Sequence, residues 1–237
     1  MKTNFIFDVD GTLTPSRGII DQEFKEYFNN FCLMNEVFLV TGSDKPKTVE
    51  QLGEDTYNLC SRVYQCSGSD VWEGDVNIYK SEWTLPEEVR TWLEEVLDNS
   101  DFNIRTGNHI EQRTGMVNFS IVGRNANAEQ RAEYVTSEVN GERNYIAQSF
   151  NTQFPKLQAT VGGDTGIDIA PRGADKSQIL RDFDIETIHF YGDAMAETGN
   201  DYPLAKALQK QQLGFSHEVS NWKETWEKLR EYFTNRT

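Results

Sequence analysis

The sequence predicts an α/β fold in which a parallel-sheet core is interrupted by an inserted α/β segment. Three short apolar runs, each followed at once by polar residues, are typical of buried parallel strands and occupy residues 4–7, 37–40 and 187–192. The second and third runs are separated by a long segment that has helical and strand-like patterns of its own. We therefore expect a Rossmann-like core made of residues 1–81 and 173–237, and an α/β cap at residues 82–172.

The predicted cap carries patterns of both helix and strand. One face of a helix is indicated by Val89, Trp92, Leu93, Val96 and Leu97. Alternating stretches at residues 118–122, 157–161 and 166–170 predict strands, with a Gly-Gly hairpin signal between the last two. Asn127 with Gln130 three residues later predicts a helix start, so Arg131 falls in the first turn of a helix that reaches about residue 139.

Two carboxylates follow the first apolar run. Asp8 and Asp10 stand on either side of Val9, at the carboxyl end of the expected strand, which is the edge where open α/β sheets bind ligands. This spacing allows one carboxylate to act as a nucleophile and the other to transfer a proton. A calcium-binding loop that began at Asp8 would need glycine and glutamate where Leu13 and Ile19 stand, so that alternative fails.

A carboxylate that attacks a phosphate dianion requires cations to cancel the repulsion. Thr41, Gly42 and Ser43 follow the second apolar run and present a hydroxyl and backbone N–H groups suited to phosphate oxygens. Lys176 begins a helical segment at residues 175–183 and supplies a positive charge. Asp193 follows the third apolar run and offers an oxygen ligand for Mg²⁺.

The chain is acidic, with 23 basic and 38 acidic residues and a formal net charge of −15. This balance argues against broad binding to nucleic acid or to anionic membranes. A substrate phosphate therefore needs a local group of arginines, and the one dense basic stretch contains Arg105, Arg113, Arg124 and Arg131. Taken singly, each of these arginines is as well explained by a surface ion pair.

The order of these segments resembles the haloacid dehalogenase superfamily, and within it the eukaryotic-type phosphomannomutases over nearly the whole chain. The sequence FDVDGTLT at residues 7–14, with Arg17 beyond it, matches the opening of that family. The sequence RTGMVNFSIVGR at residues 113–124, followed by Arg131, matches its arginine-rich segment. Gly162-Gly163 with Asp168, leading to the GADK of residues 173–176, matches the stretch before its lysine.

The resemblance implies the roles of individual residues. The implied catalytic residues are Asp8 as nucleophile, Asp10 as general acid and base, and Lys176. The implied substrate-binding residues are Arg17, Thr41, Gly42, Ser43, Arg113, Arg124, Arg131, Gly166 and Asp168. Mg²⁺ is implied at Asp8, the Asp10 backbone carbonyl, Asp193 and Asp201.

The resemblance also implies the reaction and the assembly. It implies interconversion of mannose 6-phosphate and mannose 1-phosphate, with glucose phosphates as further substrates, through an aspartyl-phosphate. Glucose or mannose 1,6-bisphosphate is the implied activator. The implied active site is the cleft between core and cap. The implied assembly is a homodimer formed through the caps. Three cysteines without a C-x-x-C pair, and no signal peptide or run of the ~18 apolar residues that a membrane span needs, predict a cytoplasmic protein.

Departures from the family keep alternatives open. Gly166 stands where the family has a serine that contacts the distal phosphate, and Ala194 and Met195 replace polar residues beside Asp193. The family's cation loop is not recognisable in residues 204–214. A sugar-phosphate phosphatase of the same superfamily is therefore the second hypothesis. A sugar-phosphate-binding protein without catalysis is the least favoured, because the four acidic and basic residues of the core motifs are all present.

Overall fold

The structure is a computed structural model that describes residues 3–137, 141–184 and 187–234, with side chains described as far as Tyr232. The chain divides into two compact units. The first consists of Met1–Lys80 and Gly173–Thr237, and the second of Ser81–Arg172. The second unit begins one residue before the predicted boundary at residue 82.

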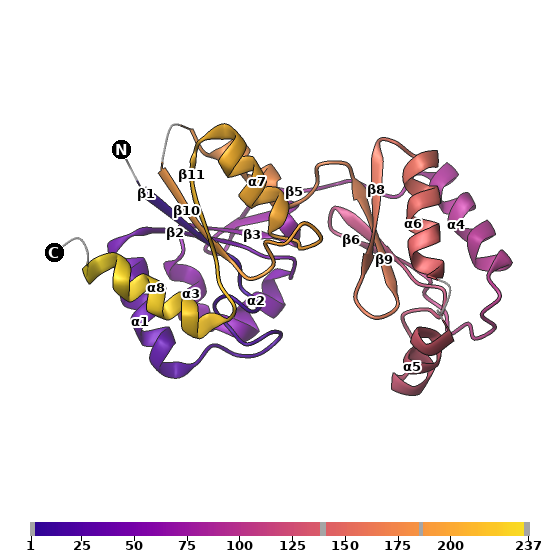
Figure 1. Cartoon of the computed structure of the whole chain (residues 1–237), viewed down its shortest axis with the longest axis horizontal. Helices are drawn as coiled ribbons and strands as arrows, with labels where there is room; N and C mark the ends of the chain where they lie inside the picture. Colours follow the sequence, from indigo (N-terminus) through magenta and orange to yellow (C-terminus); the bar gives the residue numbers. More distant parts are fainter. Residues whose placement is uncertain (1–2, 138–140, 185–186, 235–237) are drawn as a thin grey trace. The chain divides into compact units, whose positions relative to one another are not determined.

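The first unit is built on a seven-stranded sheet with the order β11-β10-β1-β2-β3-β4-β5 (Figure 1). Its parallel strands are β1 (Thr3–Phe7), β2 (Glu36–Val40), β3 (Arg62–Gln65), β10 (Thr187–Gly192) and β11 (Gly214–Glu218). An antiparallel hairpin of β4 (Asp70–Glu73) and β5 (Val76–Lys80) extends one edge. The three apolar runs thus form strands of this sheet, as predicted, and the sheet order places them next to one another.

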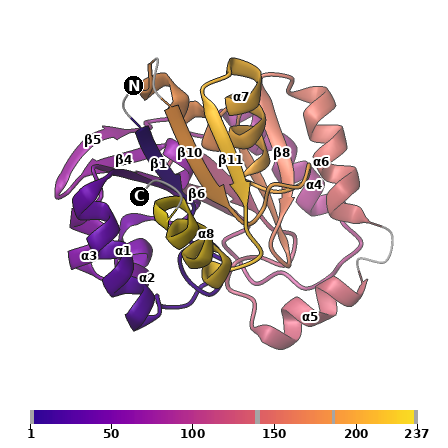
Figure 2. The ribbon, with the colours of Figure 1, turned by 60° about the vertical axis from the view of Figure 1, so that its left-hand side comes forward.

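Helices cover both faces of this sheet (Figures 1 and 2). Alternation along β1 explains why, because Phe5 and Phe7 belong to one hydrophobic cluster while Ile6 belongs to the other. The first cluster packs α1 (Gln22–Met34), α3 (Glu54–Leu59) and α8 (Trp222–Thr234). The second packs α7 (Tyr202–Gln211) and the short 3₁₀ helix η2 (Lys176–Asp182). The helix α2 (Lys45–Leu52) and the 3₁₀ turn η1 (Cys66–Gly68) follow β2 and β3.

The second unit is a four-stranded antiparallel sheet with the order β6-β7-β9-β8. Its strands are β6 (Ile110–Arg113), β7 (Met116–Phe119), β8 (Leu157–Gly162) and β9 (Gly166–Pro171). Apolar side chains of one face pack against α4 (Glu87–Asn99) and α6 (Glu142–Gln153). The helix α5 (Ala128–Ser137) follows β7, and residues 138–140, where its end was predicted, lie outside the described residues.

The opposite face of the second sheet is polar. Glu111, Asn118, Asp168 and Thr160 are successive cross-strand partners on β6, β7, β9 and β8, so their side chains share one face. The strand predicted at 118–122 instead runs over 116–119, because the chain turns after Phe119 and Gly123 takes a φ of +88°. The sequence patterns also missed β6, α6, β11 and the β4–β5 hairpin.

Among the described residues, no helix combines the length and the apolar character that crossing a membrane requires. Cys32, Cys60 and Cys66 are not joined by disulfide bonds.

Candidate active site

The predicted core residues gather at the carboxyl ends of neighbouring strands in the first unit. Asp8 follows β1, Thr41 follows β2 and Asp193 follows β10. Lys176 begins η2, whose start is capped by the Asp175 side chain. This edge of a parallel sheet is where backbone groups and loops are free to bind ligands.

Lys176 lies between two carboxylates. Its ammonium donates to Oδ1 of Asp8 at 2.5 Å and to Oδ1 of Asp201 at 2.7 Å, and the lysine side chain is not exposed. Burial raises the pKa of Asp8 to about 7, against the opposing effect of the lysine charge. Burial alone would lower the pKa of Lys176, but the two carboxylates hold it above its usual value. The lysine is therefore a fixed positive charge beside Asp8.

The donor set next to Lys176 fits a hard divalent cation. Asp8, Asp193 and Asp201 each offer a carboxylate oxygen, and these oxygens lie within 4.8 Å of one another. Carboxylate oxygens are the protein ligands that Mg²⁺ prefers. Both carboxylate oxygens of Asp201 already accept hydrogen bonds. Its Oδ1 accepts from the Lys176 ammonium, and its Oδ2 accepts from the Ala194 N–H at 3.0 Å.

Gly11 allows Asp193 to approach the loop after β1. Its φ of +82° lies in the left-handed region, and a Cβ at this position would collide with the Asp193 carboxylate. Burial, and next Asp201, raise the pKa of Asp193.

Asp10, in the loop after β1, accepts hydrogen bonds through both of its carboxylate oxygens. Its Oδ1 accepts from the Arg17 backbone N–H at 2.7 Å and from the Gln51 amide at 2.8 Å, and its Oδ2 accepts from the Ser43 hydroxyl at 3.4 Å. The Arg17 side chain is exposed, and its predicted contact with substrate stays a prediction. Sequence reasoning missed Gln51, because a single glutamine on a short helix carries no motif.

The loop after β2 contains one buried residue and one exposed residue of the predicted site. Thr41 is buried, and its hydroxyl oxygen accepts from the Ser43 N–H at 3.1 Å. Gly42 is exposed, and a Cβ there would meet no atom within 4 Å. The space in front of Gly42 is therefore accessible to a phosphate-sized group.

Two of the three predicted arginines of the second unit, Arg113 and Arg124, contact the same carboxylate. Glu111 accepts from two nitrogens of Arg113, and its Oε2 lies 3.3 Å from Nε of Arg124. Arg131 donates to the backbone carbonyls of Ala126 and Arg124, at 3.1 and 3.4 Å. Arg113 and Arg124 are an odd number of residues apart, so their side chains would face opposite sides of a straight strand. Gly115 and Gly123, both with φ in the left-handed region, turn the chain between β6 and Arg124.

Arg105 has a different role. Its guanidinium donates to the carbonyls of Leu97, Ser100, Phe102 and Ile104, at and after the end of α4. It satisfies carbonyls that a helix end leaves free, and is therefore a structural residue.

Gly166 and Asp168 lie on the polar face of the second sheet. Asn118 donates to Oδ1 of Asp168 at 2.6 Å. A Cβ at Gly166 would lie 2.5 Å from the Asn118 amide nitrogen, so a larger residue fits only if that amide moves. The two groups of predicted residues thus belong to separate units, and the expectation that they meet across a cleft stays a prediction.

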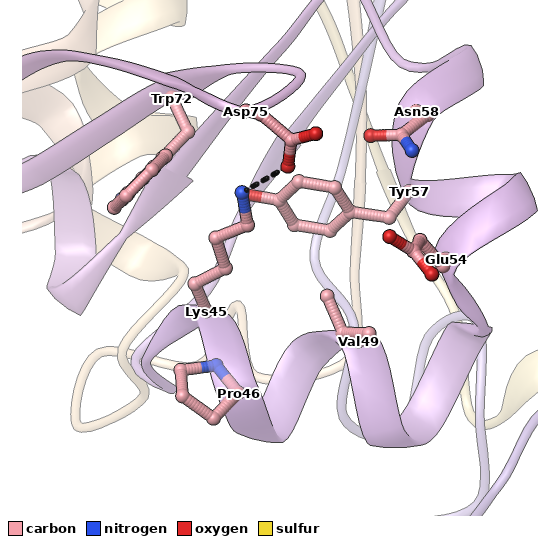
Figure 3. A pocket seen from close by; sticks show the side chains of 8 residues that line it. All are labelled: Lys45, Pro46, Val49, Glu54, Tyr57, Asn58, Trp72 and Asp75. Atoms are coloured by element: carbon pink, nitrogen blue, oxygen red, sulfur yellow. Dashed lines mark hydrogen bonds and ion pairs between the residues drawn. The ribbon is translucent and has the colours of Figure 1, made fainter.

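A pocket of about 440 Å³ lies elsewhere in the first unit, beside α2, α3 and the β4–β5 hairpin (Figure 3). Lys45 points into it, with its ammonium 4.1 Å from the centre of the Trp72 ring and 3.1 Å from Asp75. The pocket is lined by none of the predicted site residues.

Comparisons with known proteins agree on one family. Residues 24–235 match a family model described as eukaryotic phosphomannomutase. A phosphomannomutase of Dendrobium officinale is 32% identical over 239 residues, which cover 96% of this chain and 93% of that protein. A phosphomannomutase of Schizosaccharomyces pombe is 32% identical over 248 residues, 98% of this chain and 95% of that protein. The family match begins at residue 24, beyond Asp8. The alignment with the Schizosaccharomyces pombe protein covers 98% of this chain, so too few residues lie outside it for Asp8 to be among them.

Solved structures show the same fold. A haloacid dehalogenase-like hydrolase from Bacteroides thetaiotaomicron superposes with a TM-score of 0.55 at 16% identity, over 87% of this chain and 86% of that one. At this identity the likeness establishes a haloacid dehalogenase fold and nothing finer.

Proposed function

This chain belongs to the eukaryotic phosphomannomutase family, and from that premise we propose that it interconverts mannose 6-phosphate and mannose 1-phosphate through an aspartyl-phosphate at Asp8. The observation that carries the proposal is the buried contact of Lys176 with Asp8 at the carboxyl end of β1. A carboxylate that attacks a phosphate dianion meets strong repulsion, and a preorganised ammonium beside it lowers that barrier.

The residues of the first unit divide the work of phosphoryl transfer. An oxygen of Asp8 bonds to phosphorus while the bond from phosphorus to the sugar oxygen breaks. Asp10 gives its proton to the departing sugar oxygen, and takes a proton from the sugar hydroxyl when the phosphoryl group returns. Lys176 stays charged throughout, because Asp8 and Asp201 hold its pKa high.

Mg²⁺ is the proposed cofactor. Asp8, Asp193, Asp201 and the Asp10 backbone carbonyl would hold the ion, and the first three already present oxygens close together. Bound there, it would supply positive charge to the transferring phosphoryl group.

The arginines of the second unit explain why a mutase is preferred over a phosphatase. Arg113 and Arg124 share the Glu111 carboxylate, so two guanidinium groups converge on one anionic group. We propose that these two residues, with Arg131, hold the phosphate that is not reacting while the bisphosphate intermediate turns round. Arg17, Thr41, Gly42, Ser43, Gly166 and Asp168 remain proposed substrate contacts, and glucose or mannose 1,6-bisphosphate the proposed activator.

Phosphatase activity is the second candidate, because Gly166 lacks a hydroxyl and Ala194 and Met195 lack polar groups beside Asp193. Phosphorus NMR of mannose 1-phosphate with Mg²⁺, with and without a catalytic amount of glucose 1,6-bisphosphate, separates the two. A mutase gives mannose 6-phosphate that depends on the bisphosphate. Inorganic phosphate formed as fast as mannose 1-phosphate disappears, with no mannose 6-phosphate, identifies a phosphatase and rejects the mutase.

A homodimer formed through the second unit and a cytoplasmic location complete the proposal. The family resemblance supports the dimer, and cysteines without disulfide bonds fit a reducing compartment. Sedimentation analysis of the purified chain tests the dimer directly.

A further inference from the structure

Gln51 ties the loop after β1 to the helix α2. The residue is fully buried, and its amide nitrogen donates to Oδ1 of Asp10 at 2.8 Å. The same nitrogen lies 3.3 Å from the Thr14 hydroxyl and 3.3 Å from the Gly18 carbonyl. The Gln51 backbone carbonyl accepts from the Ile20 N–H at 2.9 Å. One residue therefore fixes the loop through both its side chain and its backbone.

The two oxygens of Asp10 are held very differently. Oδ1 accepts from the Gln51 amide and from the Arg17 N–H, at 2.8 and 2.7 Å. Oδ2 has one long contact, 3.4 Å from the Ser43 hydroxyl, within the loop proposed to hold phosphate. Two short bonds to Oδ1 fix the plane of the carboxylate and leave Oδ2 as its available oxygen.

The orientation of the Gln51 amide comes at a cost in free energy. Its Oε1 atom is buried and has no hydrogen-bond partner among the residues that the structure describes. An unsatisfied buried polar atom is uncommon and is often explained by function. Turning the amide over would bring Oε1 against Oδ1 of Asp10, where two acceptors repel. The contact with Asp10 therefore determines which way the amide faces.

We propose that Gln51 is a positioning residue, which occupies Oδ1 of Asp10 so that Oδ2 exchanges the proton with the sugar oxygen. The inference rests on the proposed role of Asp10 as general acid and base. When Asp8 takes the phosphoryl group, the bond from phosphorus to the sugar oxygen breaks and the proton on Oδ2 passes to that oxygen. The reverse step returns it, and Gln51 neither gains nor loses a proton.

Two phosphodonors separate positioning from a general structural effect. Glucose 1,6-bisphosphate has a poor leaving group that needs a proton, whereas the acetate of acetyl phosphate leaves without one. In Gln51→Met, single-turnover phosphorylation of Asp8 at saturating Mg²⁺ should be about ten- to a hundredfold slower with the bisphosphate, a fraction of what a general acid contributes. The rate with acetyl phosphate should change by less than about twofold, because no proton transfer is involved.

Gln65→Met is the matched control. Gln65 is also a fully buried glutamine of this unit, but it bonds to Thr48 and Tyr57. Its variant should keep the ratio of the two rates. If Gln51→Met does not fold, Gln51→Asn carries the same comparison, since it keeps an amide but is one methylene too short for the 2.8 Å contact with Oδ1 of Asp10.

The outcomes are distinct. Equal slowing with both donors, or an unchanged rate with the bisphosphate, overturns the role of Gln51. Asp10→Asn is measured alongside it. If that variant does not slow the bisphosphate reaction selectively, the proposed function of Asp10 itself is wrong. A selective effect in Asp10→Asn without one in either Gln51 variant rejects only the present inference.

Discussion

The ammonium of Lys176 lies 2.7 Å from Oδ1 of Asp201, and neither side chain is exposed to solvent. The same ammonium lies 2.5 Å from Oδ1 of Asp8. Two carboxylates share one ammonium here, so removing Lys176 would leave two buried carboxylates without a cation. Removing Asp201 instead takes one charge-assisted hydrogen bond from the ammonium and leaves Asp8 as its partner. Asp201 therefore has a structural role in addition to its proposed part in binding Mg²⁺.

Asp201→Asn should destabilise the protein by about 1.5–3 kcal/mol, the usual contribution of a hydrogen bond to a charged group. The new amide would also present a donor to either Lys176 or the Ala194 N–H, which are themselves donors. Urea unfolding of variant and parent measures the difference.

Asp55→Asn is the control for Asp201. Asp55 is exposed and pairs with the partly buried Lys25, and pairs that solvent reaches contribute about 0–1 kcal/mol. If both variants lose the same small free energy of unfolding, the Lys176 triad is not the stabilising element inferred here.

Asp8→Asn should lose essentially all turnover of hexose phosphates, because removing a nucleophile leaves only positioning and electrostatics. The parent enzyme, incubated with glucose 1,6-bisphosphate and quenched in acid, should carry a base-labile phosphate that maps to the peptide containing Asp8. Substantial residual activity, or a phosphate mapped to another peptide, contradicts the assignment.

Arg124→Ala should raise the KM for hexose phosphates about ten- to a hundredfold, since a charge-assisted bond to phosphate contributes about 1.5–3 kcal/mol. Hydrolysis of acetyl phosphate, which has no second phosphate, should barely change. Arg90→Ala serves as the control, because Arg90 lies on α4 in a loose pair with Glu87 at 4.0 Å. Equal losses by Arg124→Ala on both substrates would mean that the arginine is structural.

Stability should fall in mild acid because of His217. Burial, and next the neighbouring His189, lower the pKa of His217 to about 4. An unfolded chain binds this proton below about pH 6.5, so the contribution of His217 is complete above that pH and is lost as pH falls toward 4. The loss is on the order of 1–2 kcal/mol once the solvent that reaches this half-buried ring is allowed for.

His217→Gln replaces the imidazole with an amide that binds no proton, so this source of pH-dependent stability is removed. The free energy of unfolding, measured by urea at pH 7, 6, 5 and 4.5, should fall less steeply in the variant than in the parent. His109→Gln is measured alongside as a comparison, because it replaces a histidine of the second unit, away from the contact of His189 with His217. Identical slopes in parent and His217→Gln would exclude this histidine as a source of acid sensitivity.

The sequence predicted the core of the candidate site because parallel strands end at one edge of the sheet. Asp8 and Lys176 are 168 residues apart, yet each follows a recognisable strand end or helix start. Gln51 and Glu111 were not predicted as partners of site residues. Their contacts depend on how α2 packs against the loop and how two glycine turns bring Arg124 back to β6, and neither tertiary arrangement leaves a periodic signal. The same limit explains the missed β4–β5 hairpin, an edge whose strand β5 is exposed along its whole length.

The last prediction concerns Gly166, which lacks a hydroxyl and also has a neighbouring side chain close to where a Cβ would lie. A Cβ here would lie 2.5 Å from the Asn118 amide, which is bonded to Asp168. That amide is the far end of a side chain and can rotate, at the cost of one hydrogen bond, about 1 kcal/mol. Gly166→Ser and Gly166→Ala should therefore lose similar free energy of unfolding, while only serine restores a donor to the proposed phosphate clamp.

The two variants differ in what they do to the intermediate. A firmer clamp shortens the time in which water reaches the aspartyl-phosphate, so Gly166→Ser should lower the inorganic phosphate formed per mannose 6-phosphate without raising KM. Gly166→Ala, with the same Cβ and no hydroxyl, should leave that ratio unchanged. Phosphorus NMR with catalytic glucose 1,6-bisphosphate measures both products in one sample. If serine and alanine change the ratio equally, the effect is steric, and the glycine is not the reason that phosphate leaks to water.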